Sequence, residues 1–526
     1  MELEDLGQSA REGNVGRLFN ETARHHGDAL AVEHHGERVT HAELSERTAE
    51  FAGGLHDLGV KPGDSMLVYL PNRPEYLVAS LGALKAGVVV SPVNPQYKRR
   101  ELSYQMEDSD AAAVVTHPAL RPIVEQACEE TGREPVVITV DQRGEDDDHL
   151  FDEVRGEPTL VERDDEDVAL LPYTSGTTGK PKGVRLTHSN FRAQMFSALA
   201  PPHSIDPTEV RSLIWLPLYH ITGFTHTACQ PLVRGGALYL RSAVQWDGVE
   251  AMEMIEKEGI THFVGVTAMY VDIVNSDDFG EYDLTSLEMA AEGGAKMSET
   301  VQREFEETAG VEMAEGYGLT ETAGATHSQT GSTYGLKHGT VGQPLRMFDA
   351  KIVDEDGKDV PVGDEGELLV RGPSVMDGYH GMPDATDAAF TDDGYFRTGD
   401  VARRDTRNYY EIVDRKKHVI VSAGYNIYPS EVEELLAEHD DVAEAAVVGI
   451  DDERRNEIPV AYVVTVPDVE AGEDVTAEEI KEYSLERIAE YKHPREVRFV
   501  DELPRTTSGK IRKFKLEERY ENEEDA

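Results

Sequence analysis

The stretch Tyr173-Thr-Ser-Gly-Thr-Thr-Gly-Lys-Pro-Lys-Gly183 gathers four Ser/Thr hydroxyls, three glycines and two lysines in eleven positions. Glycines let backbone N–H groups approach phosphate oxygens, hydroxyls donate further hydrogen bonds, and lysines neutralise charge. A flexible surface turn is the alternative interpretation, but eleven ordered positions of this kind argue against it. We predict that the stretch binds a phosphate chain through Thr174, Ser175, Gly176, Thr177, Thr178, Gly179, Lys180 and Lys182.

Two widespread phosphate-binding motifs do not match the chain. A Walker A loop requires Ser or Thr after its lysine, whereas Lys180 is followed by Pro181. A dinucleotide fingerprint beginning at Gly316-Tyr-Gly318 would need a glycine where Glu321 stands. The predicted phosphate site therefore belongs to neither of these two nucleotide-binding classes.

The overall charge excludes some classes of partner. The chain has 526 residues, with 102 Asp and Glu against 51 Lys and Arg, and a formal net charge of −51. Nucleic acids and anionic membranes are polyanions, so a protein that binds them through its global charge is excluded. Cys128 and Cys229 form neither a disulfide framework nor a metal knuckle.

The acidic excess is spread along the whole chain, and arginine outnumbers lysine. Self-repulsion on this scale destabilises a compact state in ordinary salt. At molar salt the Debye length falls to ~3 Å and most of the repulsion is screened. We therefore predict a protein of a high-salt cytoplasm; an acidic protein from an ordinary organism is the alternative.

The hydrophobic pattern predicts an α/β fold. Short apolar runs such as Ser65–Leu70, Ala111–Thr116 and Ala237–Leu240 alternate with helical patterns such as Glu75–Lys85. This alternation is typical of βα units around mostly parallel sheets. From Lys351 to Val370 the pattern changes to a β-meander with a turn at Asp356-Gly.

The C-terminal part of the chain has a different pattern. It combines a helix at Glu431–Glu438, strands at Val442–Ile450 and Val460–Val466, and a helix at Glu478–Ala489. A compact α+β domain fits this order. We therefore predict a large N-terminal domain of layered sheets with a β-rich subdomain, residues 1–413, and a small α+β domain, residues 414–526.

The sequence contains no recognisable targeting signal. The acidic start Met1-Glu-Leu-Glu-Asp lacks the profile of a signal peptide, and the apolar stretch Leu77–Val93 is interrupted by Ser80, Lys85 and Ser91. We expect no membrane span and a cytoplasmic location. A homodimer is a further expectation, since dimers are common among soluble enzymes.

Two further segments carry residues suited to nucleotide chemistry. In Glu315-Gly-Tyr-Gly-Leu-Thr-Glu-Thr322, Tyr317 can stack on a purine, and Glu321 is the hard oxygen ligand that Mg²⁺ prefers. Asp400 follows a Thr-Gly turn, where a buried carboxylate can accept two ribose hydroxyls. The alternatives are a helix-capping pair at Thr320 and Glu321 and an Asx turn at Asp400.

Taken together, the phosphate stretch and the segments that follow it resemble the adenylate-forming superfamily of acyl-CoA synthetases, adenylation domains and luciferases. The resemblance covers nearly the entire chain. The matching motifs after the phosphate stretch are Trp215-Leu-Pro-Leu-Tyr-His220, Glu315 to Thr322, Arg397-Thr-Gly-Asp400, Asp414-Arg-Lys-Lys417 and Pro504-Arg-Thr-Thr-Ser-Gly-Lys510.

The resemblance implies a role for each matching residue. Lys510 is the expected catalytic lysine between carboxylate and phosphate, Asp414 the hinge about which a mobile small domain rotates, and His220 the entrance of the acyl pocket. Mg²⁺ is expected on Glu321 and Thr177. Nucleotide contacts are expected from Gly293, Gly294, Ala295, Glu315, Gly316, Tyr317, Gly318, Thr320, Asp400, Arg415 and Lys417, and a pantetheine contact from Gly424. Lys296 replaces the proline usual after the Gly-Gly-Ala turn.

Several of these residues also have a structural interpretation. His220 suits a hydrogen-bonded core histidine, and Phe224 and Tyr270 suit core packing as well as an apolar pocket wall. Amino-acid adenylation domains usually place an aspartate near His220, and its absence from His220–Phe224 argues against an amino-acid substrate. Candidates for the CoA 3′-phosphate, with solvated surface as the alternative, are Arg454, Arg455, Lys492 and Arg495.

The resemblance predicts an ATP-dependent acyl-CoA synthetase with ATP, Mg²⁺ and CoA as its cofactors and cosubstrates. A medium- or long-chain fatty acid is the expected substrate; an aryl or short-chain acid is the alternative. A carrier-protein or other acceptor in place of CoA is a second alternative. A non-catalytic acyl or nucleotide sensor is a third, although it would be expected to lose Lys510, Glu321 or Asp400, and all three are present.

Overall fold

The computed structural model describes residues 6–7, 10–145, 147–174, 181–199, 205–293, 297, 299–422, 425–452, 455–467, 469–488, 490–505 and 511–524. The chain divides into two compact units, each described here by itself. The first comprises residues 1–349 and 370–396, and the second residues 350–369 and 397–526. The domain boundary predicted at 413/414 does not coincide with the limits of these compact units, and it stays a prediction.

Two sheets dominate the first unit. The first sheet has the strand order β17-β16-β15-β14-β13-β11-β12-β1-β2, and its central pairs from β15 to β1 are parallel. Its strands are β1 (Leu30–His34), β2 (Glu37–Thr40), β11 (Arg211–Ile214), β12 (Ala237–Leu240), β13 (His262–Gly265), β14 (Met289–Gly293), β15 (Met313–Leu319), β16 (Gly324–Ser328) and β17 (Gln343–Pro344).

The second sheet has the order β20-β10-β8-β4-β3-β5-β6-β7, with β9 paired to β10. Its strands are β3 (Ser65–Tyr69), β4 (Val89–Pro92), β5 (Ala111–Thr116), β6 (Val136–Thr139), β7 (His149–Leu150), β8 (Val168–Leu170), β9 (Tyr173–Thr174), β10 (Lys182–Thr187) and β20 (Gly378–Tyr379). The pairs from β8 to β7 are parallel, whereas β10 is antiparallel to each of its neighbours. The α/β prediction with mostly parallel sheets is confirmed.

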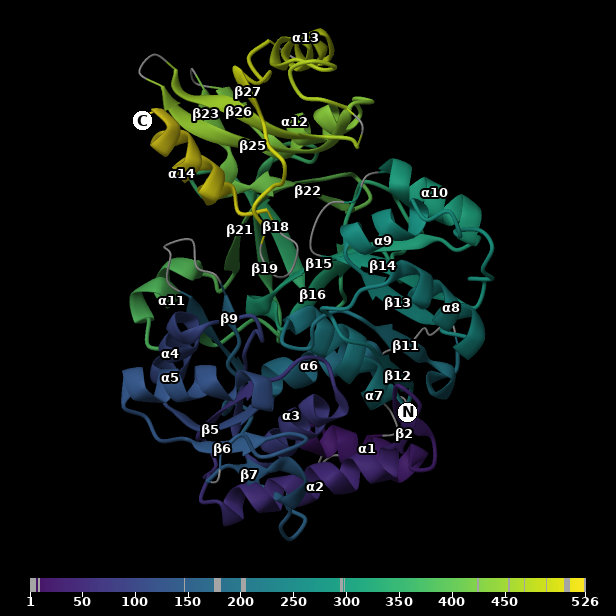
Figure 1. Ribbon diagram of the computed structural model, residues 1–526, viewed down its shortest axis with the longest axis vertical. Coiled ribbons are helices and arrows are strands. Elements are labelled where there is room, and N and C mark those ends of the chain that lie inside the picture. Colours follow the sequence, from purple (N-terminus) through teal and green to yellow (C-terminus); the bar gives the residue numbers. More distant parts are fainter. Residues whose placement is uncertain are drawn as a thin grey trace. The chain divides into compact units, whose positions relative to one another are not determined.

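Helices cover the sheets because their apolar faces must be buried. Between the sheets, α2 (His41–Asp57) packs on β1, β2 and α3 (Pro74–Ala86), and α3 packs on β3 and β4. The same layer holds α1 (Gly16–His26), α6 (His188–Leu199) and α7 (Gln230–Arg234). The outer face of the first sheet shares a core with α8 (Gly248–Glu258), α9 (Thr267–Val274) and α10 (Glu299–Ala309) (Figure 1). The outer face of the second sheet shares a core with α4 (Arg99–Asp108) and α5 (Arg121–Thr131). The short α11 (Pro383–Ala389) follows β20.

The second unit contains the predicted meander and the predicted α+β domain. The meander is a four-stranded sheet in chain order, formed by β18 (Asp349–Val353), β19 (Gly366–Arg371), β21 (Phe396–Arg404) and β22 (Tyr410–Arg415). The other sheet has the order β24-β23-β26-β25 with β27 paired to β26. Its strands are β23 (Ile420–Ser422), β24 (Tyr425–Ile427), β25 (Val442–Asp452), β26 (Asn456–Thr465) and β27 (Glu496–Phe499).

Period-two alternation along β25 and β26 gives this last sheet two apolar faces. Val447, Ala461 and Val463 face a core shared with α12 (Pro429–Ala437) and α13 (Ala477–Arg487). Val448, Val460 and Tyr462, together with Ala446, face a second core shared with α14 (Lys513–Glu524). Two separate cores on one sheet are consistent with a compact α+β domain of its own.

No helix in the described part of the chain is both long enough and apolar enough to cross a bilayer.

The buried lysine of α3 makes the stability of the first unit depend on pH. The Lys85 side chain is fully buried, and its Nζ donates to the Ser45 carbonyl at 2.9 Å and to Ser45 Oγ at 3.3 Å. Among the described residues it has no carboxylate partner. Burial lowers the pKa of Lys85 to about 7. The unfolded chain therefore binds more protons than the folded chain between pH 7 and 10.5, and stability rises with pH over this window.

We predict that Lys85→Met raises the free energy of unfolding at pH 6.5 by a few kcal/mol, because it removes the cost of burying a charge. The difference from the wild type is expected to shrink as the pH rises toward 10. The Ser45 carbonyl keeps a hydrogen bond from Thr48 Oγ1 at 2.9 Å in the variant. Urea unfolding at pH 6.5, 8 and 9.5 measures the difference, and parallel stability profiles of the two proteins would contradict the assignment.

Candidate active site

The two flanks of the phosphate stretch are held by strand pairing. β9 and β10 are antiparallel, with Lys182 opposite Thr174 and Gly183 opposite Tyr173. Helix α4 anchors both flanks: Tyr173 donates its hydroxyl to Asp108 Oδ2 at 2.7 Å, and Tyr104 donates to the Pro181 carbonyl at 2.8 Å. Ser175, Gly176, Thr177, Thr178, Gly179 and Lys180 lie outside the described residues. The structure therefore places the ends of the predicted phosphate loop, Thr174 and Lys182, side by side.

Strand β20 joins this pair of strands to Glu321. Val184 of β10 is opposite Tyr379, whose hydroxyl donates to Glu321 Oε1 at 3.0 Å. The ammonium of Lys182 lies 4.6 Å from the centre of the Tyr379 ring, a cation–π contact. Burial and the neighbouring Glu321 carboxylate raise the pKa of Tyr379, so the phenol keeps its proton for this hydrogen bond. Lys182, Tyr379 and Glu321 thus form a contiguous cluster at the end of the phosphate stretch.

The turn that carries Glu321 is fixed through its backbone. Thr320–Thr322 form a 3₁₀ turn, and the following Ala323 has φ +56°, a left-handed conformation that costs a non-glycine residue energy. Gln194 of α6 holds this turn by donating to the Thr322 carbonyl at 3.0 Å and to the Ala325 carbonyl at 2.9 Å. The Glu321 carbonyl accepts from the Met376 N–H at 2.7 Å. The position of the carboxylate is therefore determined from three separate elements.

A half-buried histidine completes the support of this turn. His226 lies in the π-helical segment η6 (Thr222–Cys229), and its Nε2 accepts from the Ala325 N–H at 2.7 Å. Nε2 therefore carries no proton, and Nδ1, 2.9 Å from Gln230 Oε1, donates to that oxygen. Burial lowers the pKa of His226, which keeps the ring neutral and able to accept the hydrogen bond.

The predicted nucleotide segment before this turn runs along β15. Glu315 is buried and its N–H donates to Gln329 Oε1 at 3.2 Å. Gly316 pairs with Gly293 of β14, so these two predicted adenine-side positions are neighbours. At Gly318 a Cβ atom would lie 2.2 Å from the Gly324 carbonyl oxygen, which explains why the turn needs glycine there. Gly294 and Ala295 lie outside the described residues.

Tyr317, predicted to stack on a purine, is half-buried on the same strand. Its ring lies edge-on to that of His327, with centroids 5.9 Å apart.

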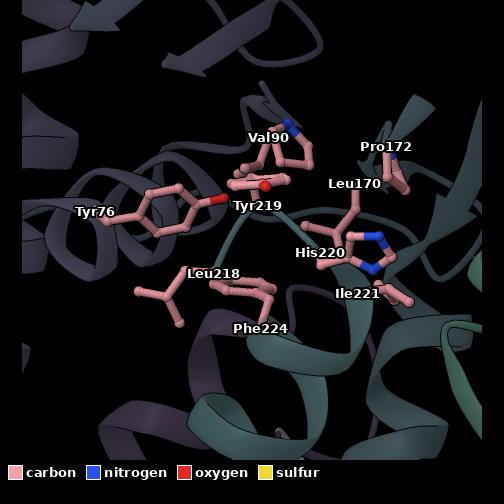
Figure 2. Close-up of a pocket in the computed structure, with 10 residues that line it drawn as sticks. Tyr76, Val90, Leu170, Pro172, Leu218, Tyr219, His220, Ile221 and Phe224 are labelled. Atoms are coloured by element: carbon pink, nitrogen blue, oxygen red, sulfur yellow. The ribbon is translucent and has the colours of Figure 1, made fainter. Parts of the chain in front are cut away.

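His220 lines an apolar pocket in the first unit. Figure 2 shows Tyr76 on one side of it, Leu218 and Phe224 on another, and His220 beside Ile221. Val90, Pro92, Leu170, Pro172 and Tyr219 complete the lining. Gly223, at the start of η6, lies so close to the Pro217 carbonyl oxygen that a Cβ would come within 2.1 Å of it. The cavity between the side chains is about 10 Å³, close to the space of one water molecule, so a ligand enters only if these side chains move.

Asp400 and Arg415 meet in the second unit. They are opposite each other on β21 and β22, and Arg415 Nε lies 2.7 Å from Asp400 Oδ1. The Asp400 side chain is 3% exposed, so this carboxylate is buried and paired. Nearby, the Glu367 carboxylate accepts from Arg397 Nη1 and Lys416 Nζ, both at 3.1 Å, which ties β19 to the ends of the same two strands. Lys417, in the 3₁₀ turn that follows, is exposed.

The expected hinge residue is also held in the second unit. Asp414 accepts from the N–H groups of Arg415 at 2.6 Å and Ser430 at 3.0 Å. His418 and Lys513, together with these N–H groups, outweigh the effect of burial and lower the pKa of Asp414.

The remaining candidate residues of the C-terminal part are only partly described by the structure. Lys510, Gly424 and Arg454 lie outside the described residues. Among the 3′-phosphate candidates, Lys492 forms an ion pair with Glu431 at 2.6 Å, and Arg455 donates its N–H to Asp452. Arg495 bonds the Glu490 carbonyl through Nη2 at 3.1 Å.

Sequence reasoning missed Tyr379, Gln194 and His226. None of them stands in a recognisable motif, and each reaches the site through pairing or packing of segments far apart in the chain. The π-helical turn at His226 also has no signal in the hydrophobic pattern, although such turns are frequent at functional sites.

The donor set fits Mg²⁺ rather than a metal held by protein alone. Glu321 supplies a carboxylate oxygen next to the phosphate stretch, and the described residues contain no cluster of three or more His, Cys, Asp or Glu that would hold a metal ion. Mg²⁺ is commonly bound by one or two carboxylates together with substrate phosphates and waters. The site therefore fits a metal that arrives with a nucleotide.

Comparison with known proteins gives this site a family. Residues 19–380 match the model of the AMP-binding enzyme family, and residues 431–510 match that of the AMP-binding enzyme C-terminal domain. The chain is 35% identical to a feruloyl-CoA synthase of Amycolatopsis sp over 94% of this chain and 96% of that protein. It is 32% identical to a long-chain-fatty-acid–CoA ligase of Bacillus subtilis over 96% and 94% of the two chains.

Solved structures agree with this assignment. The ATP-bound structure of MatB from Rhodopseudomonas palustris has a TM-score of 0.87 and 29% identity, covering 96% of this chain and 99% of that one. A benzoate CoA ligase from Burkholderia xenovorans has a TM-score of 0.85 and 27% identity, covering 96% and 99%. The chain therefore belongs to the AMP-binding enzyme family, that of the adenylate-forming CoA ligases.

Proposed function

We propose that the protein converts a carboxylic acid, ATP and CoA into acyl-CoA, AMP and pyrophosphate. The observation that carries the proposal is the cluster of Lys182, Tyr379 and Glu321 at the end of the phosphate stretch. It brings a cation and a hard oxygen ligand to the place where a triphosphate would lie. CoA as the acceptor is supported by the names of the relatives, and a carrier protein is the alternative acceptor.

In the first half-reaction a carboxylate oxygen attacks the α-phosphorus of ATP, a C(O)–O–P bond forms, and pyrophosphate leaves. Two anions must approach each other, and we assign Lys510 to offset their repulsion in the transition state. Glu321, together with Thr177, would hold Mg²⁺, which when bound neutralises phosphate charge. Tyr379 keeps the Glu321 carboxylate in one orientation through its hydroxyl.

We assign the nucleotide contacts to the other candidate residues. Asp400 would accept the ribose hydroxyls, with Arg415 beside it at 2.7 Å as a charge partner. The paired residues Gly293 and Gly316 would contact adenine, and the Tyr317 ring would stack on the adenine. In the second half-reaction the CoA thiolate attacks the acyl carbonyl, a thioester forms, and AMP leaves. We assign the Gly424 loop to the pantetheine path after rotation about Asp414.

The lining of the pocket at His220 guides the choice of acids. A medium- or long-chain fatty acid stays our first proposal, because the pocket at His220 is apolar. An aryl acid is the second candidate, because Tyr76, Tyr219 and Phe224 line the pocket and offer aromatic faces and edges to a flat ring. The cytoplasmic location and the homodimer stay predictions from the sequence.

The decisive assay measures AMP formation from ATP and Mg²⁺ at molar KCl with acetate, octanoate, palmitate, benzoate and ferulate, each with and without CoA. We expect CoA-dependent AMP formation with one class of acid. Acid-dependent pyrophosphate release that CoA leaves unchanged would replace CoA by another acceptor. ATP binding without turnover on a wider set of acids would instead favour a sensor.

We predict that Tyr379→Phe raises the Mg²⁺ concentration needed for half-maximal pyrophosphate release by about 10- to 150-fold, the equivalent of one lost hydrogen bond to a charged group. The acid KM should change little, because Tyr379 is not among the residues that line the pocket at His220. Tyr395→Phe, which alters another tyrosine of the first unit, is the control. An unchanged Mg²⁺ requirement would argue against Glu321 as the metal ligand.

The salt requirement tests the predicted high-salt adaptation. With a net charge of −51, we expect the melting temperature to rise as KCl increases from 0.1 to 2 M, because screening removes self-repulsion. Differential scanning fluorimetry measures this change. A melting temperature that is independent of KCl over this range would favour the ordinary acidic protein.

A further inference from the structure

A buried asparagine lies where three strand ends of the first unit come together. Asn72 follows the end of β3 by three residues, and its side chain contacts Leu216, just beyond the end of β11, and Arg241, directly after β12. β3 belongs to one of the two large sheets, and β11 and β12 belong to the other. In α/β folds, ligands bind beyond the carboxyl ends of parallel strands. Asn72 therefore joins the two sheets at the edge where a ligand is expected.

The amide of Asn72 is satisfied on both sides. Its Nδ2 donates to the Leu216 carbonyl at 2.9 Å and to the Arg241 carbonyl at 3.1 Å, and its Oδ1 accepts from the Leu218 N–H at 2.8 Å. Only 4% of the residue is exposed. A buried amide that bonds three backbone groups resists displacement, because any shift leaves polar groups without partners.

One of these partners is itself rigidly held. The Arg241 guanidinium is 10% exposed and forms ion pairs with Glu33 at 3.0 Å and Glu250 at 3.1 Å. Arg241 thus ties the end of β12 to β1 and α8. Asn72 is thereby attached to a fixed point of the first sheet, and it is able to position the segment around Leu218 on its other side.

That segment forms part of the pocket at His220. Leu218, which donates to Asn72, lines the pocket together with Tyr219 and His220. Across the pocket from His220 lies Tyr76, in the first turn of the helix α3 that begins two residues after Asn72 (Figure 2). The Tyr76 ring lies edge-on to Phe224, with centroids 6.2 Å apart. Asn72 therefore forms a hydrogen bond to the segment that supplies one wall of the pocket. In the chain, it directly precedes the helix that supplies Tyr76 to the other wall.

We propose that Asn72 is a positioning residue that sets the separation between the two walls of the acyl pocket, and thereby the acid preference of the enzyme. This inference rests on the proposed function, because it takes the pocket at His220 as the acid site. Asn72 does not line the pocket, so it acts through Leu218 and through the helix that carries Tyr76.

Asn14 offers a matched control. It is 1% exposed, and its Nδ2 donates to the carbonyls of Leu84 and Val161, both at 2.8 Å, while its Oδ1 accepts from the Gly16 N–H at 2.9 Å. The number and kind of hydrogen bonds are those of Asn72. None of these residues lines the pocket at His220. Asn14→Ala and Asn72→Ala therefore remove the same hydrogen bonds at two different places.

The first measurement does not require turnover. Hydrogen–deuterium exchange of peptides that span residues 216–221 should become faster by about tenfold or more in Asn72→Ala, because the Leu218 amide loses its acceptor. The same peptides should exchange at the wild-type rate in Asn14→Ala. Equal exchange in both variants would overturn the positioning role, whatever the enzyme acts on.

The second measurement concerns acid preference. In ATP–pyrophosphate exchange, Asn72→Ala should raise the KM of the preferred acid and reduce the kcat/KM ratio between that acid and its next homologue by about tenfold, with the ATP KM within about twofold of the wild type. Asn14→Ala should keep the wild-type ratio. A ratio that changes equally in the two variants would overturn the specificity role, whereas no exchange in the wild type with any acid would contradict the proposed function instead.

A second variant covers the case in which Asn72→Ala does not fold. Asn72→Asp keeps an acceptor for the Leu218 N–H, but a carboxyl group donates to the Leu216 or Arg241 carbonyl only when it is protonated. We expect its acid preference to approach that of the wild type as the pH falls. Asn14→Asp should show no such change, and identical pH profiles for the two aspartate variants would overturn the proposal.

Discussion

The antiparallel pairing of β10 with three different strands is the interaction on which the candidate site depends. Through β9 it closes the phosphate stretch, through β8 it joins the large parallel sheet, and through β20 it brings Tyr379 to Glu321. Side chains alternate between the two faces of a strand, so a slip of one residue in this register would turn Lys182 and Tyr379 to the opposite faces. The register of β10 therefore decides whether Lys182, Tyr379 and Glu321 lie in contact.

Elsewhere in the first unit, polar side chains hold segments that strand pairing does not fix. Gln194 and His226 hold the turn of Glu321 through backbone groups, and Asn72 holds the segment that leads to His220. Gln194 and Asn72 are buried and His226 is half-buried, and each has its amide or ring bonded to the backbone of another element. Buried polar groups of this kind stabilise one arrangement over others, because most alternatives leave a donor or acceptor without a partner. Glu321 and His220 are therefore positioned by residues to which we assign no part in the reaction itself.

The sequence was sufficient for elements with a strong local signal. The strands at Ala111–Thr116 and Ala237–Leu240 have the predicted bounds, since their apolar runs end abruptly at polar or glycine-rich neighbours. The pairing of Asp400 with Arg415 was not predictable, although both were candidates, because it depends on the register of β21 and β22. Tyr379 gave no signal, because its role arises only when β20 pairs with β10, almost 200 residues earlier in the chain. The narrow cavity at His220 follows from side-chain packing, which spacing does not encode.

The path of the chain between the two units has a consequence for synthesis on the ribosome. The first unit is interrupted after residue 349 and is completed only by residues 370–396, which include β20. Domains form as units while the chain emerges from its N-terminal end. The strand that completes the phosphate edge is thus the last strand of its unit to be made, and part of the meander is synthesised before it. A nascent chain that ends before residue 378 has two nearly complete sheets but no tyrosine beside Glu321. It therefore has no assembled site with which to capture nucleotide until almost three quarters of the 526 residues have been made.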